Sequence, residues 1–323
     1  MISIIIPIYN SSSTLERCVN SILRQDFPDF EVLLVDDGSK DDSLSIAKKL
    51  NLKDDRIRVF HKENGGVSSA RNLALDYAKG EYVCFIDSDD YVEPNYLSAM
   101  YVHRDCDMVV CGYYVDWLDA NGVLKHQDVA FLPQQGKFEI AQGCDCVFEL
   151  FANGKIHINC NKLLKRSIIE DNHIRYTPIP VNEDYMFMIE YLKHAKNLYS
   201  IPEVTYHWIH VENLRTGVDS IPANLIDIYL EAQAQTYPLF RNPSLVDQVF
   251  YYTYEIVARK YMIAAKQGVI SKEECLCQLK CMFGASGVKK AWSSHRSKTK
   301  GEWLSRVLLK YQFFDLYQKL FLK

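Results

Sequence analysis

The sequence lacks long apolar runs and any segment typical of export. None of its apolar stretches approaches the roughly 20 residues that a helix needs to cross a bilayer. The first residues, MISIIIPIYN, carry no basic n-region and are interrupted by Pro7, so a core strand is a better interpretation than a secretory signal. We therefore expect the protein to be cytoplasmic.

Two glycine-rich signatures of phosphate binding are also missing. The first apolar segment runs into Pro7, Tyr9 and Asn10, where a dinucleotide-binding fold would need a glycine fingerprint to bring a helix close to a pyrophosphate. No GK[ST] loop occurs anywhere in the chain. These absences exclude a dinucleotide fingerprint site and a P-loop, so any bound nucleotide must be held in another way.

Paired CxxC spacing, the usual signature of a zinc site, is absent although the chain has 10 cysteines. The nearest approach is Cys275, Cys277 and Cys281, with Cys144 and Cys146 elsewhere. Thiols scattered through a long chain without an export signal favour reduced, buried cysteines over disulfides or zinc.

Strong charge of either sign is absent except at the C-terminal end. The 323 residues are 48% hydrophobic and 24% charged, with a formal net charge of −4, which excludes disordered and fibrous classes and gives no reason to expect a nucleic-acid partner. From residue 288 to 323, nine Lys or Arg stand against Glu302 and Asp315, a local balance of 9 − 2 = +7.

The first hundred residues alternate between strand-like and helix-like segments. Because the strand-like segments are apolar on both faces, they predict an α/β fold with a mostly parallel sheet and flanking helices. We expect strands at residues 2–6, 30–35, 57–60 and 82–86, and helices at residues 13–23, 42–50 and 68–78.

After a further strand at residues 108–114 the pattern changes. Residues 118–131 hold an Asn121, Gly122 turn signal and predict a hairpin. Helices are expected after Gly143 and at residues 184–196, and the chain is almost purely helical from residue 223. We place a domain boundary near residue 215, with a helical C-terminal domain at 216–323.

Polar residues follow three of the predicted strands, where parallel α/β sheets bind ligands. The most unusual set is Asp87, Asp89 and Asp90, which follow the buried strand at residues 82–86. Carboxylates suit a hard divalent cation such as Mg²⁺ or Mn²⁺, which would cancel their repulsion. The alternative is that they only cap a turn, and this is the interpretation that we prefer for Asp90.

Two further segments are candidates for chemistry. ENGGVSSARN, residues 63–72, places a glycine loop before a helix whose first turn holds Arg71, an arrangement that suits a diphosphate or is an ordinary capped helix. In VNEDYMF, residues 181–187, Glu183 and Asp184 either complement the dipole of a helix or provide a general base.

As an ordered set, five segments resemble the family 2 glycosyltransferases, which have a GT-A fold. More narrowly, the chain is similar to bacterial enzymes that build capsular polysaccharide and exopolysaccharide. The resemblance covers about residues 1–215 and implies nucleotide-sugar binding in 1–115 and an acceptor and catalytic part in 116–215. The five segments are SIIIPIYN, LLVDDGSKDDS, NGGVSSARN, GEYVCFIDSDD and NEDYMF.

The resemblance implies roles for the nucleotide-binding residues. Pro7 and Tyr9 would line the base and ribose, and Asp37 would hydrogen-bond a uracil ring. Arg71 would approach the diphosphate or the base. Asp87 would lie near the ribose or a metal-bound water.

The same resemblance implies the metal and catalytic residues. Asp89 and Asp87 form the DxD element, with Asp89 as the direct ligand of Mg²⁺ or Mn²⁺. Asp184 corresponds to the catalytic base, with Glu183 beside it. His210 is a candidate third metal ligand or phosphate contact, although a structural histidine is common at such positions. Lys162, in CNKLLKR, faces the substrate or packs in the core.

The predicted function is therefore metal-dependent, inverting transfer of a sugar from a UDP-sugar to a hydroxyl group, in bacterial surface polysaccharide synthesis. The acceptor would be a glycan or an undecaprenyl-diphosphate-linked glycan. One alternative is a haloacid-dehalogenase-like phosphatase, although its DxD motif normally follows the first strand of the domain. Another is a catalytically silent subunit that binds nucleotide-sugars.

The tail at residues 302–323 has apolar residues at helical intervals with Arg306, Lys310 and Lys319 between them. Such a basic amphipathic helix suits peripheral contact with the inner face of the cell membrane. Packing on the domain and contact within a homo-oligomer are the alternatives.

Overall fold

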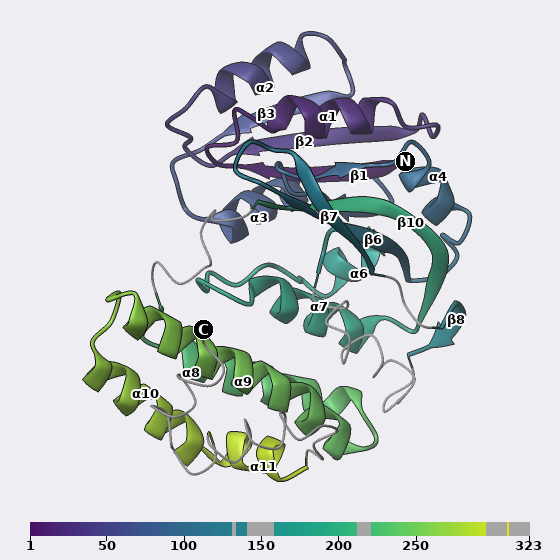
Figure 1. Ribbon diagram of the computed structural model, residues 1–323. Helices are drawn as coiled ribbons and strands as arrows, with labels where there is room; N and C mark the ends of the chain where they lie inside the picture. The colour runs from purple at the N-terminus through teal and green to yellow at the C-terminus, as the bar shows by residue number, and fades with distance from the viewer. Residues whose placement is uncertain (131–133, 141–157, 212–220, 295–308, 310–323) are drawn as a thin grey trace. The chain divides into compact units, whose positions relative to one another are not determined.

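The structure is a computed structural model that describes residues 1–130, 134–140, 158–211, 221–294 and 309 (Figure 1). The helix predicted after Gly143 and the tail at residues 302–323, apart from Leu309, lie outside the described residues. The chain divides into two compact units. The first is Met1–Ala141, Glu149–Ile179 and Glu183–Glu212, and the second is Gln142–Phe148, Pro180–Asn182 and Asn213–Lys323.

The first unit is built on a ten-stranded sheet, with the order β3-β2-β1-β4-β9-β6-β10-β5 and with β7 and β8 paired to β6 and β10. The strands are β1 (Ile2–Ile8), β2 (Phe30–Asp36), β3 (Ile57–His61), β4 (Tyr82–Phe85), β5 (Tyr91–Val92), β6 (Met108–Leu118), β7 (Leu124–Ala130), β8 (Gly136–Glu139), β9 (Lys162–Lys165) and β10 (Asn197–Val211).

The sheet is mixed, with most strands in one direction. β1 runs parallel to β2 and β4, and β2 to β3. β9 lies antiparallel between β4 and β6, so that β6 and its parallel partner β10 run in the direction of β1. The remaining strands, β5, β7 and β8, pair antiparallel with their neighbours. The carboxyl ends of β1, β2, β4, β6 and β10 therefore meet at one edge.

The six helices of this unit among the described residues are α1 (Leu15–Leu23), α2 (Ser43–Asn51), α3 (Val67–Tyr77), α4 (Tyr96–Tyr101), α6 (Arg166–Asp171) and α7 (Glu183–His194). Every residue of β1 is buried, because both of its faces are covered. Alternate residues such as Ile4 and Ile6 share a core with α1, α2 and α4, and α3 packs against β1 and β2. This two-sided burial explains the continuous apolar strands in the sequence.

The hairpin predicted after residue 118 is confirmed. β6 pairs antiparallel with β7, and the turn between them has Gly122 at φ +77°, where a side chain would be strained. The strand β9 was not predicted, because its pairing partners β4 and β6 are distant in sequence and its four residues show no clear alternation.

The second unit is helical in its described part. Its elements are α8 (Leu225–Thr236), the 3-10 helix η2 (Tyr237–Leu239), α9 (Pro243–Lys266), α10 (Lys272–Gly284) and α11 (Ser286–Ser294). The long helix α9 packs against α8, α10 and α11. The prediction of an α/β fold with a helical C-terminal region is therefore confirmed.

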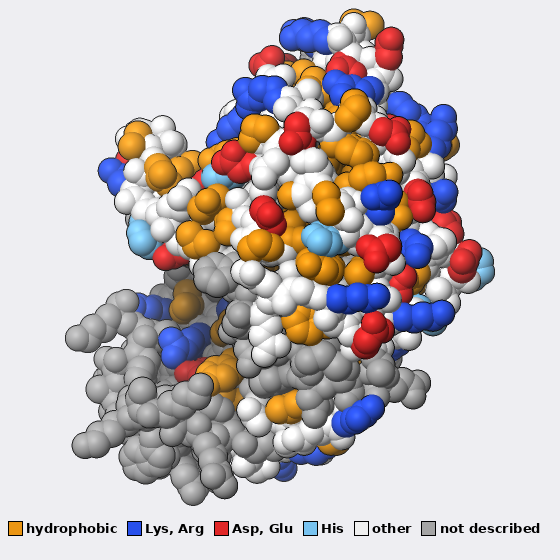
Figure 2. Space-filling view, turned by 90° about the vertical axis from the view of Figure 1, so that its right-hand side faces the viewer, with side chains coloured by type: hydrophobic (Ala, Val, Ile, Leu, Met, Phe, Trp, Pro, Cys, Tyr) orange, Lys and Arg blue, Asp and Glu red, His pale blue; other side chains and the backbone are white. Residues whose placement is uncertain are grey.

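No helix among the described residues has both the length and the apolar character needed to cross a bilayer. On the face in view in Figure 2, acidic and basic side chains are interspersed with apolar ones over the described surface.

Candidate active site

The acidic cluster lies at the carboxyl end of β4, where the chain turns sharply. The N–H of Asp90 donates to the carbonyl of Asp87 at 3.1 Å and closes this turn. The turn gives the three carboxylates different surroundings, because Asp87 is partly exposed, Asp89 is exposed and Asp90 is only 1% exposed. They are therefore not equivalent as ligands.

Asp90 holds β10 against this turn. One of its oxygens accepts a hydrogen bond from the hydroxyl of Tyr206, and the other accepts from the N–H of Ile209 at 2.8 Å. Burial raises the pKa of Asp90 well above its ordinary value, and the charges of Asp89 and Asp87 add to this rise. These are the contacts of a structural side chain.

Arg71 joins the acidic cluster to the start of α7. Its guanidinium group, 3% exposed, contacts Asp87 Oδ1 at 2.9 Å, Asp184 Oδ1 at 2.5 Å and Glu183 Oε1 at 3.4 Å. It also lies over the ring of Tyr176, 5.2 Å from the centroid. The structure thus brings four of the predicted site residues together around one buried cation, a bridge that the sequence analysis did not foresee.

Asp184 is positioned by a second residue that the sequence analysis missed. Asn159, which is fully buried, donates from Nδ2 to Asp184 Oδ1 at 2.9 Å and to the hydroxyl of Tyr176 at 2.6 Å. Burial raises the pKa of Asp184 to about 7; the charge of Arg71 opposes the rise, and those of Glu183 and Asp87 add to it. A carboxylate with such a pKa is suited to accept a proton near neutral pH.

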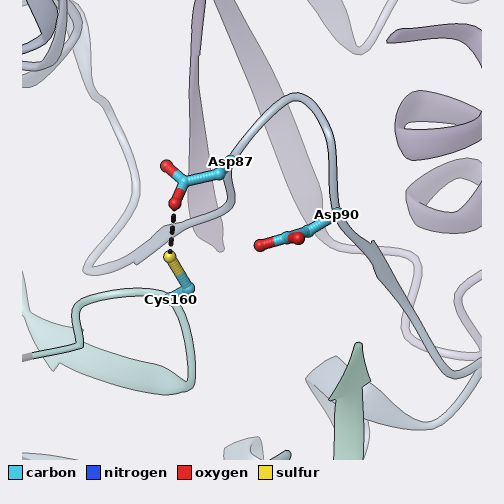
Figure 3. A group of neighbouring side chains, drawn as sticks. All are labelled: Asp87, Asp90 and Cys160. Carbon is cyan, nitrogen blue, oxygen red and sulfur yellow. Dashed lines mark hydrogen bonds between the residues drawn. The ribbon is translucent and has the colours of Figure 1, made fainter. Parts of the chain in front are cut away.

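Cys160, from the same segment as Asn159, contacts the acidic cluster directly. Its thiol donates to Asp87 Oδ2 at 3.2 Å, and Asp90 faces the pair from the other side (Figure 3). Ligand atoms of Asp87, Asp90 and Cys160 lie within 4.8 Å of one another, so this group is able to hold a metal ion. Burial raises the pKa of the Cys160 thiol, which keeps it protonated and makes it a poor metal ligand.

The exposed carboxylate of Asp89 fits a cation better. Among the described residues no other side chain forms a hydrogen bond or ion pair with this carboxylate, although the carbonyl of Asp89 accepts from Arg17. Loss of solvation and the charge of Asp87 both raise the pKa of Asp89, so a cation beside the two would relieve their repulsion.

The nucleotide-binding residues predicted at the ends of β1 and β2 lie at the same edge. Pro7 is buried in β1, and Tyr9 is exposed just beyond it. Asp37 is buried and binds the glycine loop, accepting from the N–H of Gly65 at 3.0 Å and of Gly66 at 2.7 Å. Lys62 also donates to Asp37 Oδ1. The carboxylate of Asp37 thus fixes the loop that leads into α3.

Two other predicted residues are held by contacts of their own, although the charge of Lys162 acts on Asp184. His210 is near the end of β10, with its ring 4.1 Å from that of Trp117, and it is not among the residues grouped around Asp87. Lys162 is 0% exposed and donates to the carbonyl of Ile158 and to Asn161 Oδ1, so it packs in the core. Burial lowers the pKa of Lys162 to about 7.

Carboxylates gathered at the carboxyl edge of an α/β sheet are an arrangement that GT-A glycosyltransferases share with other α/β enzymes. The sequence model described as "Glycosyl transferase family 2" matches residues 3–172. The chain therefore belongs to glycosyl transferase family 2.

Curated relatives from two bacteria carry the same class of name. Glycosyltransferase GlyG of Streptococcus pneumoniae is 42% identical over 118 residues, which cover 35% of this chain and 39% of that protein. The uncharacterized glycosyltransferase EpsJ of Bacillus subtilis is 31% identical over 260 residues, which cover 75% of this chain and 70% of that protein. The first of these matches thus spans well under half of the relative's length.

Solved structures share the fold at low identity. S. aureus TarS 1-349 in complex with UDP-GlcNAc has a TM-score of 0.68 at 21% identity and covers 98% of this chain and 89% of that one. GalNAc-T7 with UDP, GalNAc and Mn²⁺ has a TM-score of 0.55 at 16% identity and covers 79% of this chain and 50% of that one.

Proposed function

We propose that the protein transfers a sugar from a UDP-sugar to a hydroxyl group of a glycan acceptor, with inversion at the anomeric carbon. The observation that carries the proposal is the cluster around Arg71, which places a carboxylate with a pKa of about 7, Asp184, next to the acidic turn after β4. Family membership and a structural relative solved with UDP-GlcNAc support it.

In this proposal Asp184 is the general base. The acceptor oxygen attacks the anomeric carbon, its proton passes to the Asp184 carboxylate, and the bond from that carbon to the diphosphate breaks with its electron pair on the leaving UDP. Asn159 and Arg71 fix the orientation of Asp184, and Glu183 adds a second carboxylate beside it. Such proton transfer contributes about 10²- to 10⁴-fold.

The donor site in this proposal is formed by Pro7, Tyr9, Asp37, Arg71 and Asp87. Each oxygen of a carboxylate accepts about two hydrogen bonds, and Asp37 Oδ2 receives one from Gly66, so it has room for one uracil N–H. Arg71 supplies positive charge toward the diphosphate.

Asp89 and Asp87 would hold the divalent cation, Mg²⁺ or Mn²⁺, because both follow β4 at the acidic turn, where Asp89 is exposed and Asp87 is partly exposed. When bound, the cation would stabilise charge that develops on the leaving diphosphate. A structural relative solved with Mn²⁺ supports this assignment. His210 as a third ligand stays a prediction, and the acceptor subsite proposed below is the alternative role for its ring, which lies beside Trp117.

The acceptor proposed from the resemblance is a glycan of a bacterial surface polysaccharide, free or linked to undecaprenyl diphosphate. Residues 116–215 would contribute its site. Peripheral membrane contact through the tail, a homo-oligomer and a cytoplasmic location stay predictions. The phosphatase alternative is set aside because the chain belongs to a glycosyltransferase family.

The direct test is a screen of UDP-sugars for release of UDP by the purified protein with and without EDTA. We expect one donor to turn over with Mn²⁺ or Mg²⁺, and EDTA or Asp89→Asn to lower its turnover by about 100-fold, since a metal contributes several kcal/mol at such a site. Asp55→Asn, which removes an exposed carboxylate elsewhere in the same unit, should have no effect. Full turnover in EDTA would remove the metal from the proposal.

A pH profile tests the state of Asp184. Because the base works only when deprotonated and its pKa is about 7, kcat/KM should rise with pH through about 7 and level off above it. The profile is measured as UDP release at subsaturating donor from pH 5 to 9. A rate that is already constant from pH 5 would contradict a base with a raised pKa.

A further inference from the structure

We propose that the extended ends of β6 and β10 form a subsite on which a pyranose ring of the acceptor glycan stacks. The subsite, which we call the aromatic strip, consists of Trp117 on β6 and Trp208 and His210 on β10. This inference rests on the proposed function and adds to it the part of the protein that selects the acceptor.

The pairing of the strands places the aromatic strip beyond the acidic turn in the direction in which β6 runs. Val83 of β4 and Met108 of β6 both pair with Leu164 of β9, so the end of β4 at Phe85 lies level with Val110 of β6. β6 then continues to Leu118, so its last eight residues extend past the end of β4, where the acidic turn begins. Because β10 pairs with β6 as far as Leu118, the two strands together extend the sheet next to the acidic turn. We call this two-stranded extension the ledge.

The aromatic strip lies on the face of the ledge that leads to the acidic turn. Tyr206, Trp208 and His210 alternate along β10 and therefore share one face. The hydroxyl of Tyr206 donates to Asp90 and accepts from the N–H of Asp87 at 3.4 Å, which fixes the start of this face at the acidic turn. Trp208 follows two residues later, about 7 Å along the strand, roughly the length of one sugar unit.

The opposite face of the ledge is a closed polar network that holds the two strands rigid. The ring of His207 is stacked 4.1 Å from Tyr91 and 4.6 Å from Tyr114, and its Nδ1 is 2.8 Å from Asp116 Oδ2. Its Nε2 is 3.0 Å from Glu93 Oε1. On the face that bears Trp208, Tyr113 and Val115 are buried in the core, so the part of this face that is open to a ligand begins at Trp208.

The composition of the aromatic strip suits a sugar. Trp208 is 44% exposed, and its ring lies 6.4 Å from His210, which in turn lies 4.1 Å from Trp117. The C–H faces of a pyranose are apolar and weakly positive, so they pack on the electron-rich face of an indole ring.

The rim of the strip offers polar partners for sugar hydroxyls. Asp128 on β7 accepts from Trp117 Nε1 at 3.0 Å and contacts His126 Nε2 at 2.8 Å, and both Asp128 and His126 are exposed. A few polar groups around an apolar platform are typical of small-ligand sites, whereas an anionic membrane would be repelled by this carboxylate.

The test compares Trp208→Ala with Trp208→Phe and with Tyr77→Ala, a matched control because Tyr77 is an exposed aromatic residue of the same unit. The probes are a panel of defined oligosaccharides as acceptors, with the donor sugar identified by the screen. We expect Trp208→Ala to raise the KM for the oligosaccharide by about tenfold, Trp208→Phe to restore most of the affinity, and UDP binding to be unchanged in all three.

A second readout separates failure of this inference from failure of the proposed function. In NMR spectra of the full chain, oligosaccharides should shift the indole N–H signals of Trp117 and Trp208. They should leave the signal of Trp292, in the other unit, unchanged. UDP should bind without shifting the signals of Trp117 and Trp208. If no UDP-sugar binds or turns over, the proposed function fails, while these shifts still support the aromatic strip. If a donor turns over and Trp208→Ala keeps the wild-type oligosaccharide KM, the inference is overturned. A Trp208→Ala variant that changes only the oligomeric state would also overturn it, in favour of a protein contact.

Discussion

Asp184→Asn is expected to lower sugar transfer by about 10²- to 10⁴-fold while UDP binding stays near normal. The amide keeps the size of the side chain and a carbonyl oxygen for Arg71 and Asn159, but it cannot accept the acceptor proton. Transfer is followed by UDP release in the presence of acceptor, and UDP binding by calorimetry.

The matched control for this change is Asp171→Asn, which alters an exposed carboxylate at the end of α6. It should leave both measurements unchanged. If Asp184→Asn transferred sugar at a near-normal rate while binding UDP, Asp184 would not be the base. The same experiment with Glu183→Gln would then show whether its neighbour has that role.

Arg71→Met is expected to destabilise the protein by about 3 kcal/mol at pH 8 and by less at pH 5, and to abolish transfer. The change leaves Asp87, Glu183 and Asp184 close together without their common cation. We expect the loss in the free energy of unfolding to lie at the lower end of the range for breaking a buried ion pair, because these three carboxylates are partly exposed.

The sign of the pH effect follows from proton binding. Burial raises the pKa of Asp184 to about 7, and the charge of Arg71 opposes this rise. Without Arg71 the pKa of Asp184 rises further above its value in the unfolded chain, so the folded variant binds more protons and loses stability as pH rises. Chemical denaturation of wild type and variant at both pH values measures the difference.

Arg175→Met is the control, because Arg175 pairs with Asp76 and Glu170 at the surface. Its cost should be below about 1 kcal/mol. Equal costs for the two variants would mean that the cluster around Arg71 does not stabilise the fold.

Much of the first unit was predictable from residue patterns. The strands β1 to β4 begin and end within two residues of their predicted bounds. A strand that is buried on both faces is a continuous apolar run, so the turn residues on either side of the run indicate where the strand ends. β5, β8, β9 and the 15-residue strand β10 were not predicted, since each pairs with strands that are distant in the sequence.

The site was predictable as a set of residues but not as an arrangement. Motif order placed Asp87, Arg71, Glu183 and Asp184 at one edge of a sheet. The resemblance assigned Arg71 to the diphosphate or the base of the nucleotide. It did not predict that the guanidinium group contacts all three carboxylates. Asn159 and Cys160 were missed, because a short polar segment gives no signal until it lies beneath Asp184 and Asp87.

The sequence by itself therefore determined the fold class, the glycosyltransferase family and the identities of the acidic and basic candidates, because these depend on local periodicity and on the order of motifs. Only the tertiary structure decided the surroundings of each candidate. Asp90 is buried under Tyr206, Asp89 stays open to solvent, and Asp184 reaches a pKa of about 7. Burial and charge coupling set these differences, and both depend on residues that are far apart in the chain.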